Sequence, residues 1–216
     1  MNKTDLKLYA ITDRQWLHGA RLSEHVKLAI EGGATMIQIR DKDILSTDSD
    51  AGLKDEYQEA LEIKRICHEH KVPLIINDNV QFAIDIDADG VHLGQDDMNP
   101  AEARKLLGAD KIIGVTAKTV EQAKKAQADG ADYLGSGAVF GSTTKLNAKP
   151  MTKELLREIT AAVDISVVAI GGINADNAAT LKGTGIAGIA VVGAIFASAD
   201  IKAAAKELAE ICDKML

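Results

Sequence analysis

The most constraining feature of this sequence is an alternation, repeated eight times, between a short β-rich run and a longer segment with helical character. Such an alternation is typical of βα units around a parallel sheet, whose strands are short apolar runs because both of their faces are buried. We expect strands of about four to six residues at Lys7–Thr12, Met36–Arg40, Leu74–Asn77, Gly90–Leu93, Ile112–Thr116, Tyr133–Ser136, Val167–Ile170 and Gly188–Val192.

Helical segments lie between these strands, and several of them have recognisable ends. Polar residues that can accept hydrogen bonds from unpaired backbone N–H groups stand near three expected starts: Ser23 with Glu24, Asn99 before Pro100, and Thr119 before Val120. Glycines that favour left-handed caps follow four helices: Gly32–Gly33, Gly108, Gly130 and Gly183. The expected helices are Leu22–Glu31, Leu53–His70, Val80–Ile86, Pro100–Leu107, Val120–Asp129, Lys153–Val163, Ala175–Lys182 and Ile201–Lys214.

Eight βα units favour an α/β fold of the TIM (β/α)8 barrel type over an open doubly wound sheet. An open sheet usually has about five or six strands and a Gly-x-Gly-x-x-Gly turn after its first strand, whereas this chain continues into Arg14-Gln15-Trp16. The length of 216 residues suits one such barrel, and no linker divides the chain. We therefore expect a single domain over residues 1–216, with the acidic stretch Thr47–Glu56 as a βα loop before the second helix.

Charge and composition narrow the classes of partner. The net charge of −7 argues against broad binding to nucleic acid or to an anionic membrane, although a local basic pocket for phosphate remains compatible with it. Neither a signal peptide nor a long apolar span is evident, so we expect a cytoplasmic protein with small-molecule partners. Cys67 and Cys212 lie in helix-like segments and are expected to be reduced core thiols.

Polar residues cluster at the ends of the expected strands, and all strands of a parallel barrel point their C-terminal ends at one face. Gln38, Arg40 and Lys42 follow a period of two, which places them on one face while the strand continues. Arginine grips a phosphate with a planar fork and lysine adds a compact charge, so this pattern favours a pyrophosphate site. The alternative is a pair of solvated cations beside Asp41 and Asp43.

Two aspartates at neighbouring strand ends form a candidate metal site. Asp78 and Asp97 could meet at one cation, and magnesium prefers a few carboxylates together with phosphate oxygens and water. The alternative reading is structural: Asp78 would cap the helix that begins near Val80, and Asp97 would cap the turn before Asn99. We favour the metal reading for both, and the spacing leaves Asp96 as a weaker candidate ligand.

Three further features have less specific meanings. A structural or ring-contact role is favoured for His92, and no histidine or cysteine spacing suggests zinc. The loop 137–145 carries hydroxyls and ends at Lys145, which suits an anion, although it could be a simple surface loop. Gly171-Gly172 and Gly193 follow the last two strands, where barrel enzymes often bind phosphate, but glycine pairs are also common in ordinary turns.

Taken together, these motifs resemble the thiamine phosphate synthase family over nearly the whole chain. The resemblance is carried, in order and in register, by Leu8-Tyr9-Ala10-Ile11-Thr12-Asp13, Gln38-x-Arg40-x-Lys42, Asn77-Asp78, Gly90-Val91-His92-Leu93-Gly94-Gln95-Asp96-Asp97, Ser142-Thr143-Thr144-Lys145 and Ile170-Gly171-Gly172-Ile173. It implies a magnesium-dependent transferase that joins a hydroxymethylpyrimidine diphosphate to thiazole phosphate, giving thiamine phosphate and pyrophosphate.

The resemblance also implies roles for individual residues. The departing pyrophosphate would be held by Arg40, Lys42 and Lys145, with Asn77 nearby and Mg²⁺ on Asp78 and Asp97. Gln38 would read the pyrimidine edge, and Thr116 would stand where the family usually has serine. The thiazole phosphate would be received by Ser142, Thr144, Gly172, Val192 and Gly193. Among these residues, the expected catalytic group comprises Arg40, Lys42, Thr116 and Lys145.

The chain departs from the family pattern at four positions. Thr116 replaces serine and Ser142 replaces threonine, so both keep a hydroxyl; Gly141 replaces a common proline, and Gly193 replaces a common serine. Two rival functions remain: a thiazole tautomerase, which would not need the whole pyrophosphate clamp, and a noncatalytic phosphate-binding barrel. The complete set of cationic and acidic residues favours the synthase, and an assembly of identical chains is compatible with the sequence.

Overall fold

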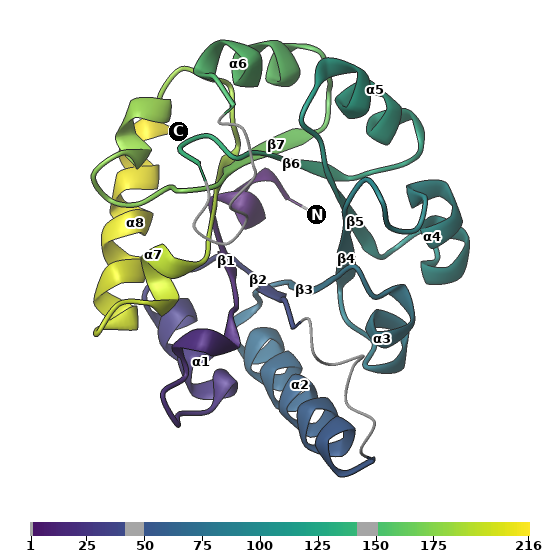
Figure 1. Ribbon diagram of the computed structural model, residues 1–216, viewed down its shortest axis with the longest axis vertical. Coiled ribbons are helices and arrows are strands. Elements are labelled where there is room, and N and C mark those ends of the chain that lie inside the picture. The colour runs from purple at the N-terminus through teal and green to yellow at the C-terminus, as the bar shows by residue number, and fades with distance from the viewer. Residues whose placement is uncertain (1, 42–49, 142–150) are drawn as a thin grey trace.

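The computed structural model describes residues 2–41, 50–141 and 151–216 of the chain, and it contains a closed barrel of eight parallel strands. Each strand pairs with its neighbours in sequence, and β8 closes the barrel against β1 (Figure 1). The expected (β/α)8 class is confirmed, and every strand boundary lies within one residue of its prediction. The strands are β1 Leu8–Ile11, β2 Met36–Ile39, β3 Leu74–Asn77, β4 Gly90–Leu93, β5 Ile112–Thr116, β6 Tyr133–Gly137, β7 Ser166–Ile170 and β8 Gly188–Val191.

Helices surround the barrel as an outer ring (Figure 1). They are α1 Leu22–Glu31, α2 Asp50–His70, α3 Val80–Asp85, α4 Pro100–Leu107, α5 Val120–Ala128, α6 Lys153–Ala161, α7 Gly193–Phe196 and α8 Ile201–Met215, with 3-10 turns η1 Lys3–Leu6, η2 Arg14–Trp16 and η3 Ala178–Leu181. The turns η1 and η2 and the short helix α7 were not expected, because one helical turn is too short to show a hydrophobic period.

Two helix predictions are wrong in part. The expected helix Ala175–Lys182 is only the turn η3, whose backbone bonds join residues three apart: Thr180 N donates to Asn177 O at 3.0 Å, and Lys182 N donates to Ala179 O at 3.3 Å. Runs of such 3-10 bonds are usually short. The acidic stretch Thr47–Glu56 is not wholly a loop, since α2 already begins at Asp50. Acidic residues are favourable in the first turn of a helix, where the helix dipole is positive.

Most of the expected caps are confirmed. Asn99 Oδ1 accepts from Ala101 N at 2.8 Å, and Thr119 Oγ1 accepts from Gln122 N at 3.2 Å. Arg21 rather than Ser23 precedes α1, and Glu24 bonds back to its N–H. The left-handed conformation is found at Gly33, Gly108, Gly130 and Gly183, whereas Gly32 has a right-handed φ of −80°.

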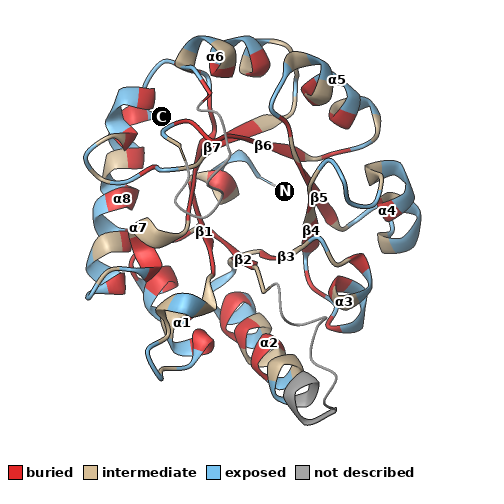
Figure 2. Ribbon diagram, in the orientation of Figure 1, coloured by how far each residue is buried: buried red, intermediate tan, exposed pale blue. Residues whose placement is uncertain are grey.

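Two apolar cores hold the barrel together, one between the sheet and the helices and one inside the barrel. The strands are buried around the whole circuit (Figure 2). The interior core contains Tyr9 and Tyr133, and Leu6 of η1 joins it from the N-terminal end of β1. Since η1 packs at that end, the polar residues that follow the strands lie at the opposite, C-terminal end.

The two cysteines are free and buried, as the sequence predicts. Burial raises the pKa of Cys67 to about 12 and that of Cys212 to about 11, so both thiols are protonated at neutral pH. Across the described residues, none of the helices combines the length and the apolar character that a membrane crossing requires.

Candidate functional site

The strand ends bring several of the predicted site residues to the C-terminal mouth of the barrel. The described residues among them are Gln38, Arg40, Asn77, Asp78, Thr116, Asp97, Gly172, Val192 and Gly193. Lys42, Ser142, Thr143, Thr144 and Lys145 lie outside the described residues, so their predicted roles stay predictions.

Asp78 and Asp97 meet at the mouth between β3 and β4. Their carboxyl groups are within hydrogen-bonding reach of each other, and Asn77 Nδ2 donates to Asp78 Oδ2 at 2.6 Å. Partial burial, followed by the contact with Asp97, raises the pKa of Asp78 to about 6, while Asn77 and the positive charge of Arg40 act in the opposite direction. The two carboxylates and Arg40 therefore belong to one electrostatic cluster.

The helix-cap alternative for Asp78 is wrong. Asn79 is the cap of α3, because its Oδ1 accepts from Phe82 N at 2.9 Å. Asp78 instead has a left-handed φ of 61°, and its N–H donates to His92 O at 2.8 Å. A non-glycine residue rarely adopts this conformation without a reason in its surroundings. The strand-to-helix turn thus holds the Asp78 carboxylate against Asp97 rather than over the helix start.

Asp97 has a structural contact as well. Its Oδ2 accepts from Gly94 N at 2.6 Å, which closes the turn after β4, as the alternative reading of this residue expects. A carboxylate has about four acceptor positions, so one backbone bond leaves Asp97 able to bind a cation. The neighbouring Asp96 is exposed.

The chemistry of this acidic pair fits magnesium. Two adjacent carboxylates repel each other, and a hard divalent cation removes that repulsion. In the described part of the chain no three His, Cys, Asp or Glu side chains are grouped for metal binding. Magnesium often uses only one or two carboxylates and completes its coordination with water and phosphate oxygens.

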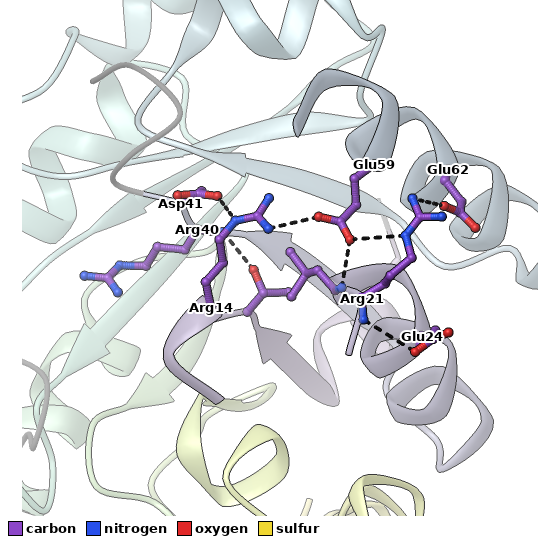
Figure 3. A network of polar contacts seen from close by, with 9 residues as sticks. Arg14, Arg21, Glu24, Arg40, Asp41, Glu59 and Glu62 are labelled. Atoms are coloured by element: carbon purple, nitrogen blue, oxygen red, sulfur yellow. Dashed lines mark hydrogen bonds and ion pairs between the residues drawn. The ribbon is translucent and has the colours of Figure 1, made fainter. Parts of the chain in front are cut away.

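Arg40 lies just beyond β2, and its side chain extends away from the neighbouring acidic network (Figure 3). The strand ends at Ile39 rather than Arg40, because Arg40 N donates to the Thr12 hydroxyl at 3.1 Å. Asp41, one of the two acidic residues of the alternative reading, forms an ion pair with Arg14. The other members of that alternative, Lys42 and Asp43, lie outside the described residues.

Arg14 and Glu59 form a partly buried ion pair next to Asp41, which the sequence did not reveal (Figure 3). Arg14 bonds Asp41 and also donates to Glu59 Oε2 at 3.0 Å, and Glu59 Oε1 accepts from Leu22 N at 2.8 Å. Partial burial opposes the charge of Arg14, but Asp41 and Glu59 outweigh it and raise its pKa. This network ties the end of β2 to η2, α1 and α2.

Loss of the Glu59 carboxylate should weaken the fold. Glu59→Gln is expected to lower the free energy of unfolding by about 2–3 kcal/mol, because it breaks an ion pair that is mostly shielded from water. The matched control is Glu62→Gln, since Glu62 pairs with Arg21 at 2.8 Å on a more exposed surface and should contribute less than about 1 kcal/mol. Urea unfolding followed by circular dichroism measures both; equal losses would contradict this reading.

The predicted site residues after β7 and β8 carry no charged side chains. Gly172 has φ of 66°, and a Cβ atom there would lie 2.7 Å from Phe140 O, so only glycine fits beside the loop after β6. Val192 precedes α7, and Gly193 is its first residue. Gly141 has φ of 84°, a value that proline cannot adopt, which accounts for the absence of the family proline there.

A line of polar side chains crosses the barrel interior below the mouth. His92 Nε2 lies 3.0 Å from Thr116 Oγ1, and His92 Nδ1 lies 3.1 Å from the Tyr133 hydroxyl. The Tyr133 and Tyr9 hydroxyls are 2.9 Å apart, and Gln38 Nε2 donates to Tyr9. The favoured structural role of His92 is consistent with these bonds. The tyrosines were not predicted as site residues, because their strands carry only a burial signal.

The fold and the site define a (β/α)8 barrel with an acidic pair, an arginine and glycine-rich turns at its C-terminal mouth, which is the arrangement of barrel enzymes that bind phosphorylated small molecules. Residues 8–195 match the family model described as thiamine monophosphate synthase. The chain therefore belongs to the thiamine monophosphate synthase family.

Individual relatives agree with this assignment. The chain is 49% identical to the thiamine-phosphate synthase of Ruminiclostridium cellulolyticum, covering 97% of each chain. It is 43% identical to that of Clostridium acetobutylicum, covering 99% of this chain and 98% of the relative. Among solved structures, thiamine phosphate pyrophosphorylase from Pyrococcus furiosus matches with a TM-score of 0.87 and 38% identity, covering 99% of this chain and 98% of that one.

Proposed function

We propose that the protein condenses 4-amino-2-methyl-5-(hydroxymethyl)pyrimidine diphosphate with thiazole phosphate to give thiamine phosphate and pyrophosphate. Family membership supports this reaction. The observation that carries it is the contact between Asp78 and Asp97 within the electrostatic reach of Arg40. A pyrophosphate with its cation needs this combination of acidic and basic groups, whereas a site for a single phosphate does not.

The pyrophosphate end of the site contains the charged residues. Asp78 and Asp97 would hold Mg²⁺, which when bound supplies positive charge to the pyrophosphate oxygens. Arg40 contacts the same leaving group from the end of β2, and Lys42 and Lys145 are proposed to add charge from the segments beyond the described residues. Asn77 keeps the Asp78 carboxylate in place through the bond at 2.6 Å.

The remaining residues are proposed to bind the two rings and the second phosphate. Gln38 and Thr116 read the pyrimidine from β2 and β5. The thiazole phosphate is received at the other side of the mouth, by Ser142, Thr144, Gly172, Val192 and Gly193. Backbone N–H groups can approach that phosphate closely because Gly172 and Gly193 have no side chain.

The chemistry requires no protein nucleophile. The amino-substituted ring stabilises positive charge at the exocyclic methylene, so the C–O bond can break with its electron pair leaving on the pyrophosphate. Arg40 and the lysines neutralise the charge that develops on this leaving group. The thiazole nitrogen then forms the new C–N bond. The barrel holds the two rings in line and excludes water, which would otherwise capture the cation.

Three mixtures of the purified protein separate this function from its rivals. Both substrates with Mg²⁺ should yield thiamine phosphate and pyrophosphate in equal amounts by mass spectrometry. A tautomerase would instead interconvert thiazole phosphate tautomers and make no thiamine phosphate. A noncatalytic barrel would bind one or both ligands in a titration without turnover. Absence of thiamine phosphate in the first mixture would overturn the proposal.

Replacing Gly193 by serine, the residue common at this position in the family, should strengthen thiazole phosphate binding. A Cβ atom on Gly193 would meet no atom closer than Ala197 Cβ at 3.8 Å, so the site has room for a side chain. Gly193→Ser adds a hydroxyl beside the proposed phosphate and is expected to lower its Kd about three- to tenfold. Titration with thiazole phosphate measures the change, with Ala203→Ser on the exposed side of α8 as the control. An unchanged or higher Kd would place the phosphate elsewhere.

The protein is proposed to act in the cytoplasm on these small soluble substrates, with no nucleic acid or membrane as partner. We also propose that residues 1–216 form one catalytic domain. A homo-oligomer is compatible with this account.

A further inference from the structure

A continuous line of hydrogen bonds joins the two residues proposed to read the pyrimidine. It runs from Gln38 on β2 through Tyr9 on β1 and Tyr133 on β6 to His92 on β4, and it ends at Thr116 on β5. Both tyrosines are at most 1% exposed and Gln38 is 2% exposed. The line therefore crosses the interior core of the barrel just below the mouth, where each donor and acceptor depends on its neighbours.

Two glycines on neighbouring strands leave room for the rings of this line. A Cβ atom on Gly114 of β5 would lie 2.1 Å from Tyr133 Cζ, so only glycine leaves room for the ring. A Cβ atom on Gly135 of β6 would lie 3.1 Å from His92 Cε1. Glycine weakens a strand and often marks a close approach. A glycine on each of two strands, β5 and β6, thus leaves the space that the Tyr133 and His92 rings occupy.

One direction of the protons gives every hydroxyl of the line both a donated and an accepted bond. Burial, above all, raises the pKa of both tyrosines, so each keeps its single proton. Gln38 Nε2 donates to the Tyr9 oxygen, while the bonds from Tyr9 to Tyr133 and from Tyr133 to His92 can each run in either direction. In the arrangement in which both hydroxyls donate as well as accept, the Tyr9 proton goes to the Tyr133 oxygen and the Tyr133 proton goes to His92 Nδ1.

The same arrangement determines the tautomer of His92 and the direction of the Thr116 hydroxyl. A histidine that accepts at Nδ1 is neutral and carries its proton on Nε2. That proton is donated to Thr116 Oγ1, 3.0 Å away. The Thr116 hydroxyl proton then points away from His92. At the near end, Gln38 uses its amide nitrogen on Tyr9, which leaves its oxygen as the group offered to a ligand.

We infer that this line makes Tyr9 the positioning residue for Gln38, and Tyr133 and His92 the positioning residues for Thr116, so that Gln38 presents a hydrogen-bond acceptor to the pyrimidine and Thr116 presents a donor. The inference rests on the proposed function. A 4-aminopyrimidine matches this arrangement, because its exocyclic amine donates and its ring nitrogens accept. A 4-oxopyrimidine places a carbonyl oxygen opposite the Gln38 oxygen, and it is rejected there because two acceptors face each other.

Ligand binding tests the Gln38 end. The probes are the unreactive alcohols, 4-amino-2-methyl-5-(hydroxymethyl)pyrimidine and its 4-oxo analogue, titrated into the full-length protein. The native protein should prefer the amino compound by about 30-fold or more, and Tyr9→Phe should reduce the preference to within about threefold because the Gln38 amide can then turn over. Tyr133→Phe removes a buried hydroxyl of the same kind but keeps the Gln38–Tyr9 bond. This variant should therefore keep the preference of the native protein for the amino compound.

Equal loss of preference in the two variants would show a general packing role and overturn the inference, as would a native protein that binds both alcohols alike. If thiamine phosphate is formed but no preference is seen, only this inference fails. If neither pyrimidine binds and no product forms, the proposed function fails with it.

Nitrogen-15 NMR of the histidines tests the far end without any ligand. At neutral pH the His92 ring should carry its proton on Nε2, with Nδ1 as an acceptor. Tyr133→Phe removes the donor to Nδ1 and should shift that resonance, whereas Tyr9→Phe should leave the tautomer unchanged. His92→Asn identifies the signal. A doubly protonated His92, or one protonated on Nδ1, would overturn the proposed direction of the line even if binding selectivity is found.

Discussion

Replacing either acidic residue of the pair by asparagine is expected to reduce kcat/KM by about 100-fold or more, because the cation that neutralises the leaving group loses a ligand. Asp78→Asn and Asp97→Asn keep the size of the side chain. The asparagine oxygen at position 97 can still accept from Gly94 N, which Asp97 binds at 2.6 Å. The barrel should therefore stay folded, and Asp78→Asn also removes the repulsion from Asp97 that adds to burial in raising the pKa of Asp78 to about 6.

The informative readout is stabilisation by Mg²⁺ with inorganic pyrophosphate, measured as a shift in Tm. The native protein should gain stability from the two together, and both variants should lose most of that gain while keeping a normal Tm without ligand. The control is Asp110→Asn, which should behave as the native protein, because Asp110 is exposed on the turn before β5 and therefore lies at the opposite end of the barrel. Full activity of both variants at limiting magnesium would show that the metal assignment is wrong.

A second large effect is expected at Lys145. If this lysine neutralises charge on the departing pyrophosphate, Lys145→Ala should slow pyrimidine C–O cleavage by about 100-fold. Thiazole phosphate affinity should change less, since backbone amides and the hydroxyls of Ser142 and Thr144 are proposed to bind that ligand. Single-turnover kinetics at saturating pyrimidine substrate isolate the chemical step, and a separate titration measures the thiazole phosphate.

The control for Lys145 is Lys153→Ala, which removes a lysine at the start of α6 that lies 5.8 Å from the Phe140 ring centroid. This variant should leave the cleavage rate near the native value. Loss of thiazole phosphate binding in Lys145→Ala with an unchanged cleavage rate would place Lys145 at the other phosphate.

The strands could be predicted because a buried parallel strand leaves a strong local signal. Each apolar run is short, and glycines or polar residues mark its ends. The meeting of Asp78 and Asp97 followed from topology alone, since neighbouring parallel strands end on one face. Knowledge of the family added roles that local pattern does not contain, such as the assignment of Thr116 to a serine position.

The remaining features depend on contacts that sequence periodicity does not encode. The period of a strand indicates that Tyr9 and Tyr133 are buried, but the contact between their hydroxyls joins positions 124 residues apart. The bond from Arg14 to Glu59 likewise spans 45 residues and joins η2 to α2. The predicted helix after β7 is only the turn η3, because the spacing of apolar residues does not distinguish its i→i+3 backbone bonds from those of an α-helix.

The measurement that tests the central claim most directly is the fate of an oxygen-18 label at the bridging position of the pyrimidine diphosphate. With thiazole phosphate and Mg²⁺ present, the account predicts that the pyrimidine C–O bond breaks. The released pyrophosphate should then carry all of the label, and thiamine phosphate should carry none. Label retained on a pyrimidine alcohol or monophosphate would mean that a P–O bond breaks instead, and it would contradict the assignment of this barrel as an alkyl transferase.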